Sequence, residues 1–180
     1  MMVRNPNLPE MTWSPQEEAT ATGLVMETLR IARARTIQEA LTFSAAGLGF
    51  DSYVLGIVAN DRRPDAESRT YVITDQVDTW VRTYDERAYL ELDPRVELAS
   101  EPGYSFWEAR QFNKNPGHKV FLKEAGENGI ESGLVIGLCT RDPPSYAMLS
   151  FNRAAPTLQR WSAEQRLLIA GQASMLGKVL

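Results

Sequence analysis

The alternation of apolar and polar positions along the 180-residue chain predicts a mixture of helices and strands. The SPQE run at 14–17 has a capping residue followed by a first-turn proline, which is typical of a helix start. The TIQE run at 36–39 predicts a second start, and this helix should end near Gly47 or Gly49. Residues 1–13, rich in Pro and Asn, precede these signals, so we expect a flexible N-terminal arm.

Short apolar runs predict the strands. Residues 52–59 (SYVLGIVA) are too few for a typical helix and apolar throughout, so we predict a strand covered on both faces. A polar loop separates this run from a second predicted strand at 69–74. Residues 133–141 and 146–152 predict two further strands, joined by a Pro-rich turn at 142–145.

Three more helices follow from start and stop signals. One begins near Asp78, another begins at Asn115 and ends at Gly129, and the last begins with a capping box at Ser162 and runs to Leu180. Because helices precede, separate and follow paired strands, we predict an α/β fold. It is an α-β-α sandwich with a central antiparallel sheet of about five strands and helices on both faces.

Composition narrows the class of protein. Apolar residues make up 43% and charged residues 23% of the chain, which is ordinary for one globular domain. The net charge is -4 and basic residues are interleaved with acidic ones, so we expect that these 180 residues do not bind nucleic acid directly. The single Cys139 fits a reducing, cytoplasmic compartment. We find no signal peptide and no apolar run near the roughly 18 residues that a membrane span needs.

The chain offers little for catalysis. His118 is the only histidine and lies in a polar helix start, and Cys139 has no His near it in sequence. The nucleophile-elbow, P-loop and zinc-protease patterns do not occur. We therefore expect no enzymatic activity, no metal site and no cofactor.

The stretch WVRTYDERAYLELDP, residues 80–94, gathers one Trp and two Tyr beside an Asp-Pro pair. On a helix, positions 77, 80, 81, 84 and 88 share one face, whereas charged residues occupy the other. Trp80 and Tyr84 should therefore point inward, one turn apart. Each carries a polar tip that needs a partner when it is buried.

Two interpretations of these polar groups remain open. Trp80 and Tyr84 could be ordinary core residues. Asp93 could cap a following helix, and Ser150 could bond the backbone. Alternatively, the four form a polar cluster in an apolar shell, which suits a ligand with a compact head bearing C=O and N–H groups and an apolar tail. A carboxylate can cap a helix and still accept a ligand N–H, so the two interpretations are compatible.

The pattern W-x3-Y-x8-D-P, followed by Phe-Trp and later by Ser-Gly before a strand, resembles the autoinducer-binding domain of LuxR-type quorum-sensing regulators. The matching residues are Trp80, Tyr84, Asp93-Pro94, Phe106-Trp107 and Ser132-Gly133. The resemblance spans roughly residues 20 to 175 and implies a bacterial sensor of N-acyl-homoserine lactones.

The resemblance also implies roles for individual residues. The Trp80 indole would bond the lactone carbonyl, and Asp93 would accept the amide N–H of the ligand. Tyr84 and Ser150 would donate to the acyl carbonyl, and Trp107 would wall the lactone ring. The acyl tail would be lined by Val54, Gly56, Val58, Thr70, Val72, Phe121, Ala125, Ile130, Val135 and Met148.

Two residues depart from the family pattern. Arg95 stands after Asp93-Pro94 where the family usually has a small or apolar residue. Its charge could add a donor, alter the acyl preference or face solvent. Gln76 replaces an aromatic residue that is common just ahead of the Trp. The bulk of Met148 and Phe121 favours a short or medium tail, and an aryl-acyl ligand is also compatible.

The resemblance further implies a domain organisation. Residues 14–180 would form the ligand-binding domain, and the C-terminal helix-turn-helix domain of family regulators, through which DNA would be bound, is absent from this chain. The chain ends in an apolar helix without a Gly or Asn cap, so we expect a segment of a longer transcription factor. Leu167-Leu168-Ile169 cannot all face one sheet, so the last helix should also contact a partner subunit in a homodimer.

Other functions stay open at this point. A PAS- or GAF-like sensor of another small molecule would share the fold, because a fold alone does not fix a ligand. A ligand-independent antiactivator would keep the fold without needing Asp93. A lactone hydrolase using Asp93 is a third alternative. The sequence does not distinguish an activator from a repressor.

Overall fold

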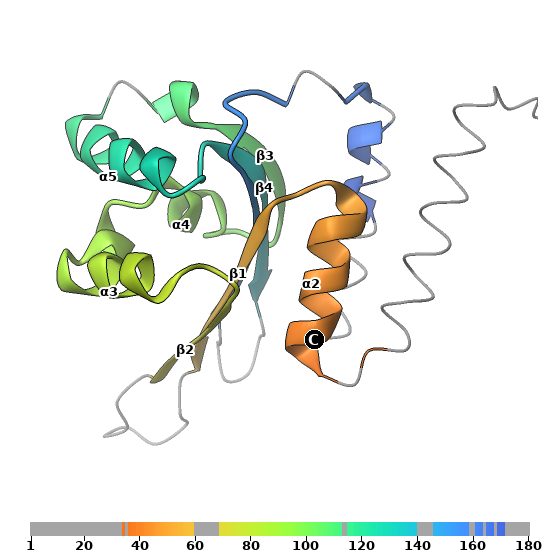
Figure 1. Cartoon of the computed structure of the whole chain (residues 1–180), viewed down its shortest axis with the longest axis horizontal. Helices are drawn as coiled ribbons and strands as arrows, with labels where there is room; N and C mark the ends of the chain where they lie inside the picture. Colours follow the sequence, from red (N-terminus) through yellow and green to blue (C-terminus); the bar gives the residue numbers. More distant parts are fainter. Residues whose placement is uncertain are drawn as a thin grey trace, which may run out of the picture.

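The structure is a computed structural model of the whole chain. Five of the predicted segments lie outside the residues that it describes. They are the arm at 1–13, the helix start at 14–17, the loop at 60–68, the turn at 142–145 and the helix end at 172–180. The residues that it describes are 34, 36–59, 69–112, 115–139, 146–158, 161–163, 165–167 and 169–171. They form an antiparallel sheet with helices on both faces (Figure 1), which confirms the predicted α/β sandwich.

The sheet has five strands in the order β2-β1-β5-β4-β3, and every neighbouring pair is antiparallel. The strands are β1 (Ser52–Ala59), β2 (Arg69–Thr74), β3 (Gly103–Glu108), β4 (Ser132–Cys139) and β5 (Tyr146–Arg153). The hydrophobic pattern located four of them. It missed β3, because burial rises along this edge strand from exposed to buried and gives no clear alternation.

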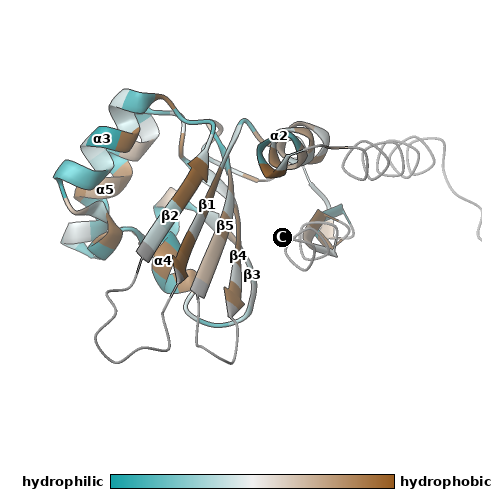
Figure 2. Ribbon diagram, turned by 90° about the horizontal axis from the view of Figure 1, so that it is seen from below, coloured by the Kyte–Doolittle hydropathy of each residue, from teal (hydrophilic) through white to brown (hydrophobic). Residues whose placement is uncertain are grey.

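The helices divide between the two faces of the sheet. Figures 1 and 2 show α2 (Ile37–Leu48) on one side, and α3 (Asp78–Glu86), α4 (Pro94–Leu98) and α5 (Pro116–Glu127) on the other. Two single 3₁₀ turns, Tyr89–Glu91 and Ala109–Phe112, connect elements on the second side. None of the helices in the described part of the chain is long and apolar enough to cross a membrane.

The caps of α2 and of the helix that begins at Ser162 are as predicted. The Thr36 side chain accepts a hydrogen bond from the backbone N–H of Glu39 at 3.1 Å, and α2 stops at Gly49, whose φ of 79° suits glycine. The capping box at Ser162 is also confirmed. Its hydroxyl accepts from the Gln165 N–H, and the Gln165 side chain accepts from the Ser162 N–H.

Alternation along the strands builds two separate cores. Leu134 and Ile136 point toward α2, whereas Val135 between them points to the opposite face. The first core joins α2 to the sheet through residues such as Leu41, Leu55, Leu149 and Phe151. The second contains Trp80, Tyr89, Trp107, Phe121, Leu122, Ala125 and Ile130. The apolar stretches of β1 and β2 are visible in Figure 2.

Candidate functional site

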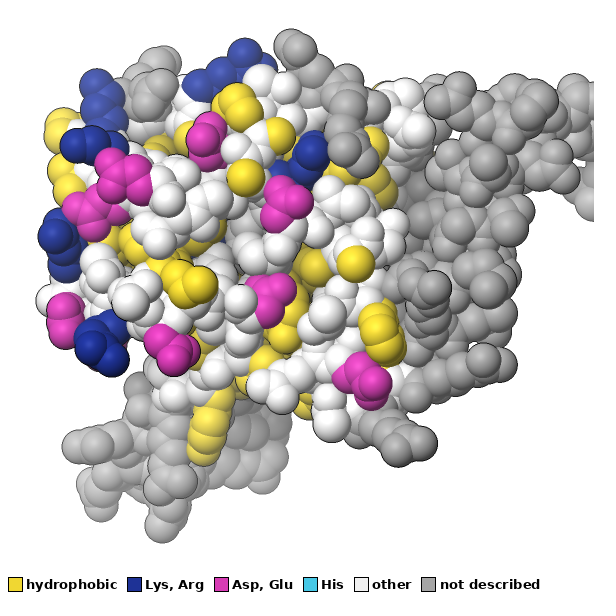
Figure 3. Space-filling view, viewed as in Figure 1, with side chains coloured by type: hydrophobic (Ala, Val, Ile, Leu, Met, Phe, Trp, Pro, Cys, Tyr) yellow, Lys and Arg dark blue, Asp and Glu magenta, His cyan; other side chains and the backbone are white. Residues whose placement is uncertain are grey.

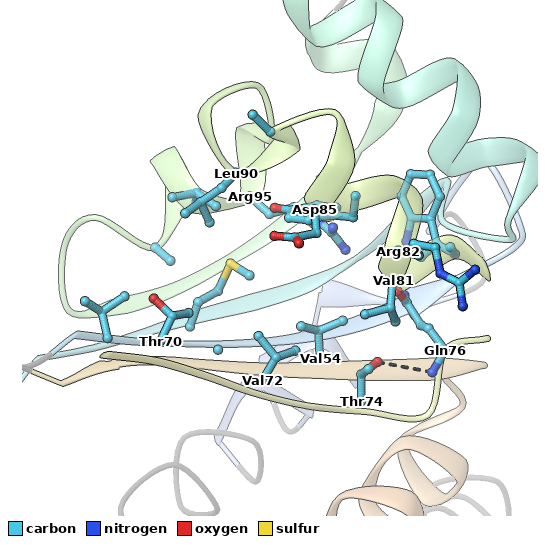
Figure 4. A pocket seen from close by; sticks show the side chains of 18 of the residues that line it. Val54, Thr70, Val72, Thr74, Gln76, Val81, Arg82, Asp85, Leu90 and Arg95 are labelled. Carbon is cyan, nitrogen blue, oxygen red and sulfur yellow. Dashed lines mark hydrogen bonds between the residues drawn. The ribbon is translucent and has the colours of Figure 1, made fainter. Parts of the chain in front are cut away.

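A pocket of about 490 Å³ lies on the second face, between the sheet and the segment from α3 to the end of α4. Figure 4 shows its two sides, with Val54 and Val72 on the strands and Arg95, Asp85 and Leu90 across from them. The lining residues are Val54, Gly56, Val58, Thr70, Val72, Thr74, Gln76, Asp78, Trp80, Val81, Arg82, Tyr84, Asp85, Ala88, Leu90, Arg95, Val96, Ala99 and Met148.

The strand side of the pocket follows from the sheet register. Val54, Gly56 and Val58 of β1 pair with Thr74, Val72 and Thr70 of β2, so all six residues share one face. Met148 of β5 lies opposite Gly56 on the other side of β1. A Cβ added at Gly56 would meet no heavy atom within 4 Å, so this glycine leaves open space in the pocket. The strand side is therefore mainly apolar.

An aromatic cluster forms the wall near α3. The Trp80 ring centroid lies 6.2 Å from that of Tyr84 and 6.0 Å from that of Tyr89. Phe121 of α5 contacts all three rings, with centroids 5.4 to 6.2 Å away. Trp80 and Tyr84 lie on the inward face of α3, as the helical spacing predicts. Val77, on the same predicted face, is exposed instead, because α3 begins only at Asp78.

Asp93 and Arg95 form a buried ion pair behind this wall. Asp93 caps α4, because its Oδ1 accepts the backbone N–H of Arg95 at 2.9 Å. The Arg95 guanidinium bonds the same carboxylate through Nε at 2.9 and 3.1 Å and through Nη2 at 2.7 Å. The Tyr84 hydroxyl donates to Oδ2 at 3.0 Å. Asp93 is 3% exposed and Arg95 2%, so solvent hardly weakens the pair.

Further contacts hold Arg95 in place. Its Nη1 donates to the Asn152 side-chain oxygen at 2.8 Å, and the Ser150 hydroxyl donates to that same oxygen at 2.8 Å. The guanidinium carbon lies 5.7 Å from the Trp107 ring centroid and 5.5 Å from that of Phe121. Cation–π attraction to both rings adds to the ion pair. Arg95 is thus a fixed cation at the pocket wall.

Burial and charge set the protonation of this cluster. Burial raises the pKa of the Tyr84 phenol, and the negative charge of Asp93 raises it further. Burial alone would lower the pKa of the Arg95 guanidinium, but the attraction of Asp93 outweighs burial and raises it. At neutral pH Tyr84 is therefore a neutral donor, and Arg95 keeps its charge.

The sequence-predicted site residues fall into two groups. Eight of them line the pocket: Val54, Gly56, Val58, Thr70, Val72, Trp80, Tyr84 and Met148. The other seven lie deeper and do not line it: Asp93, Trp107, Phe121, Ala125, Ile130, Val135 and Ser150. Arg95 lines the pocket and contacts three of these deeper residues, Asp93, Trp107 and Phe121.

Sequence reasoning also missed several lining residues. Thr74 continues the i, i+2 spacing of Thr70 and Val72, so strand parity could have found it. Leu90 lies in a single 3₁₀ turn, Val96 in the five-residue helix α4 and Ala99 at its C-terminal cap, and these elements are too short to give a periodic signal. Their side chains reach the pocket only because of how these elements are folded.

One lining residue carries an unsatisfied donor. The side-chain nitrogen Nε2 of Gln76 is buried and has no hydrogen-bond partner in the part of the chain that the structure describes. Its backbone N–H donates to the Thr74 hydroxyl at 3.1 Å, which is the dashed line in Figure 4. A buried amide nitrogen without a partner costs free energy, so this nitrogen would gain from a ligand acceptor.

The described residues offer no arrangement for metal chemistry. No group of three or more His, Cys, Asp or Glu side chains among them is placed to hold a metal ion. His118 stacks edge-on against Phe112, with ring centroids 6.0 Å apart, and does not line the pocket.

A five-stranded antiparallel sheet with an apolar pocket under its helices is the architecture of a ligand-sensing α/β domain. Comparison with known families shows that the chain belongs to the autoinducer binding domain family, whose model matches residues 33–177. The family comprises ligand-sensing domains of LuxR-type quorum-sensing regulators, which confirms the resemblance drawn from the sequence. No match was found among curated proteins.

Solved structures support the fold. The N-acylhomoserine lactone dependent LuxR family transcription factor CepR2 from Burkholderia cenocepacia is 23% identical, with a TM-score of 0.66 over 88% of this chain and 92% of that one. SdiA in complex with octanoyl-rac-glycerol is 20% identical, with a TM-score of 0.62 over 92% and 67%. The solution structure of Escherichia coli SdiA 1–171 is 22% identical, with a TM-score of 0.61 over 91% and 96%.

Proposed function

We propose that this chain is the sensor of a quorum-sensing transcription regulator and binds an acyl-tailed autoinducer, of the N-acyl-homoserine lactone class, in the pocket between the sheet and α3–α4. The observation that carries the proposal is the pocket itself. Its volume of about 490 Å³ lies inside the range of roughly 300–1,000 Å³ typical of small-molecule sites. Its apolar strand side faces the buried polar cluster of Tyr84 and Arg95.

The two sides of the pocket suit different parts of such a ligand. The tail would lie on Val54, Val72 and Met148 around the space left by Gly56, and each buried methylene contributes about 0.8 kcal/mol. The head would lie near Trp80, Tyr84 and Arg95, whose polar groups provide discrimination. Asp93 and Ser150 would act through Arg95 and Asn152 rather than by touching the ligand.

Solvent exposure around the pocket supports coupling between ligand and stability. Val72 is 56% exposed and Leu90 51%, although both line the pocket. A ligand would cover these apolar side chains. On the face seen in Figure 3, hydrophobic side chains are interspersed with charged ones. A ligand at 100 times its Kd would stabilise the folded state by about 2.7 kcal/mol.

The ligands of two structurally similar proteins support this ligand class. CepR2 depends on an N-acylhomoserine lactone, and SdiA binds octanoyl-rac-glycerol. An acyl chain is common to both. We extend the proposal to a homodimer that binds DNA through a separate domain, as the family resemblance implies.

Filling the pocket tests the proposal. Gly56→Leu should place a side chain in open space without a backbone clash, so the Tm of the free protein should hold or rise. The Tm increase produced by a panel of N-acyl-homoserine lactones in wild-type protein should disappear in this variant. Thermal unfolding followed by circular dichroism measures both.

The matched control is Gly171→Leu, since a Cβ there also meets nothing within 4 Å and the residue does not line the pocket. This variant should keep the ligand-induced shift. If Gly56→Leu kept the full shift as well, the ligand would bind elsewhere and the proposal would fail.

A further inference from the structure

The acceptor that a ligand amide would need is already saturated. An ionised carboxylate offers about four lone-pair sites. Four donors of the protein use those of Asp93: the Arg95 backbone N–H, its Nε–H, its Nη2–H and the Tyr84 hydroxyl. Asp93 is also not part of the pocket lining. A ligand N–H therefore has no free oxygen of Asp93 to bond.

The pocket wall presents hydrogen-bond donors of Arg95 and Gln76 instead of the Asp93 carboxylate. A guanidinium has five N–H groups. Asp93 and Asn152 engage Nε–H, one N–H of Nη2 and one of Nη1, so one N–H on each terminal nitrogen has no partner among the described residues. The Gln76 nitrogen Nε2 adds another buried donor without a partner. The inner wall is therefore rich in donors.

The charges around the pocket select against an anion. Arg95 is compensated by Asp93 at 2.7 Å, so the pair is neutral as a unit. Among the other lining residues, Asp78 and Asp85 are acidic and Arg82 is basic. The sum of these five charges is therefore one negative. Because these charges sum to one negative, a carboxylate entering the site would lose hydration without a net positive charge to offset that loss.

We propose that the head of the ligand is neutral and acceptor-rich, and that Arg95 and Gln76 bind its carbonyl oxygens without any need for a ligand N–H. The inference rests on the proposed function and specifies the ligand chemistry of the same pocket. Lactones, esters and other multiply carbonylated heads on an apolar tail belong to this class. The amide of an N-acyl-homoserine lactone is then tolerated but is not recognised through its N–H.

A matched ligand pair tests this on the wild-type chain. One ligand is an N-acyl-homoserine lactone, and the other is the ester in which oxygen replaces the amide N–H, with the same tail and ring. Isothermal titration calorimetry should give Kd values within about threefold of each other, because no buried acceptor loses a partner. If the amide bound about 10-fold tighter than the ester or more, the inference would be overturned while the proposed function would stand. Failure of both ligands to bind would overturn the proposed function, and the inference with it.

Removing the guanidinium should change the preference. Arg95→Met frees lone pairs of Asp93 and deletes the donors, so the amide should now bind about 10-fold tighter than the ester. The matched control Arg110→Met changes an exposed arginine outside the pocket and should leave the ratio of Kd values unchanged. Circular dichroism reports whether Arg95→Met folds. If it does not fold, the ratio of the amide and ester Kd values in the wild-type protein decides the inference.

A third ligand tests the neutrality of the head. The ring-opened N-acyl homoserine has the same tail and a carboxylate in place of the lactone. Its Kd should be at least about 10-fold weaker than that of the lactone, since the charges of the site sum to one negative. Equal or tighter binding of the carboxylate would overturn the proposal that the head is neutral.

Discussion

The guanidinium of Arg95 ties together residues that are distant along the chain. It links the cap of α4 to Asn152 of β5 and lies between aromatic rings from β3 and α5. A buried ion pair of this kind is not in itself strongly stabilising, because desolvation offsets the attraction. Its integrity nevertheless matters, since either partner alone would be an uncompensated buried charge.

Asp93→Ala therefore tests the pair. The substitution should lower the free energy of unfolding by about 3–5 kcal/mol, because it leaves the Arg95 cation buried and removes the α4 cap. Urea denaturation of the ligand-free protein measures the loss. Asp85→Ala, at an exposed position of α3, is the control and should change stability by less than about 0.5 kcal/mol. Similar values for the two variants would mean that the buried pair contributes nothing.

The sequence could not predict where the Arg95 side chain lies. Charged residues are almost never fully buried unless paired, so an arginine beside a helix start is normally expected in solvent. Its burial depends on Trp107 and Phe121, which tertiary packing brings from other elements. By contrast, Trp80 and Tyr84 were placed correctly, because helical spacing alone fixes their direction.

At the scale of elements, the sequence located four strands, including the edge strand β2, but missed the other edge strand, β3. β1 and β2 have the predicted bounds, because each is a short run of β-branched and aromatic residues. The missed β3 forms an edge of the sheet, where only the last two residues are buried. This strand can be recognised only from its pairing with β4, in which Trp107, for example, lies opposite Gly133.

Gly133 shows how closely two elements approach. A Cβ there would lie 2.1 Å from the carbonyl oxygen of Phe151 on β5 and 3.0 Å from the Trp107 indole nitrogen. Gly133→Ala should therefore force β4 away from β5 and destabilise the protein by about 3 kcal/mol or more. Thermal and urea unfolding measure the effect.

Gly56→Ala is the matched control, since its Cβ meets nothing within 4 Å. It should cost little or should stabilise, because alanine restricts the unfolded chain. Comparable losses at the two glycines would contradict the close approach of β4 and β5.

At the scale of the whole molecule, Glu108 connects the sheet to the chain that follows β5. Its Oε1 accepts the backbone N–H of Leu158 at 2.8 Å, and its Oε2 accepts from Arg110 Nε at 2.7 Å. The hydrogen bond from Leu158 and the nearby Arg110 lower the pKa of this buried carboxyl. A lowered pKa stabilises the fold fully above the ordinary value of 4.5, and this stabilisation is lost as pH falls below it.

Glu108→Gln should thus be less stable than wild type by about 1–3 kcal/mol near pH 7. The difference should shrink as pH falls toward about 3, because the wild-type carboxyl becomes protonated as well. Urea denaturation across this pH range measures the difference, with exposed Glu97→Gln as the control. A constant difference at every pH would show that ionisation of Glu108 does not stabilise the fold.

The two halves of the second face of the sheet differ in one respect. Over β3 and β4 the chain supplies its own interior, through Trp107, Phe121 and their neighbours, whereas over β1 and β2 it leaves a hollow. Under the proposed function, the missing part of the interior is a molecule made outside the protein. The folded fraction of such a regulator would then rise with the concentration of that molecule. Bacterial population density would therefore set how much of the regulator stays folded, rather than which of two folded conformations it adopts.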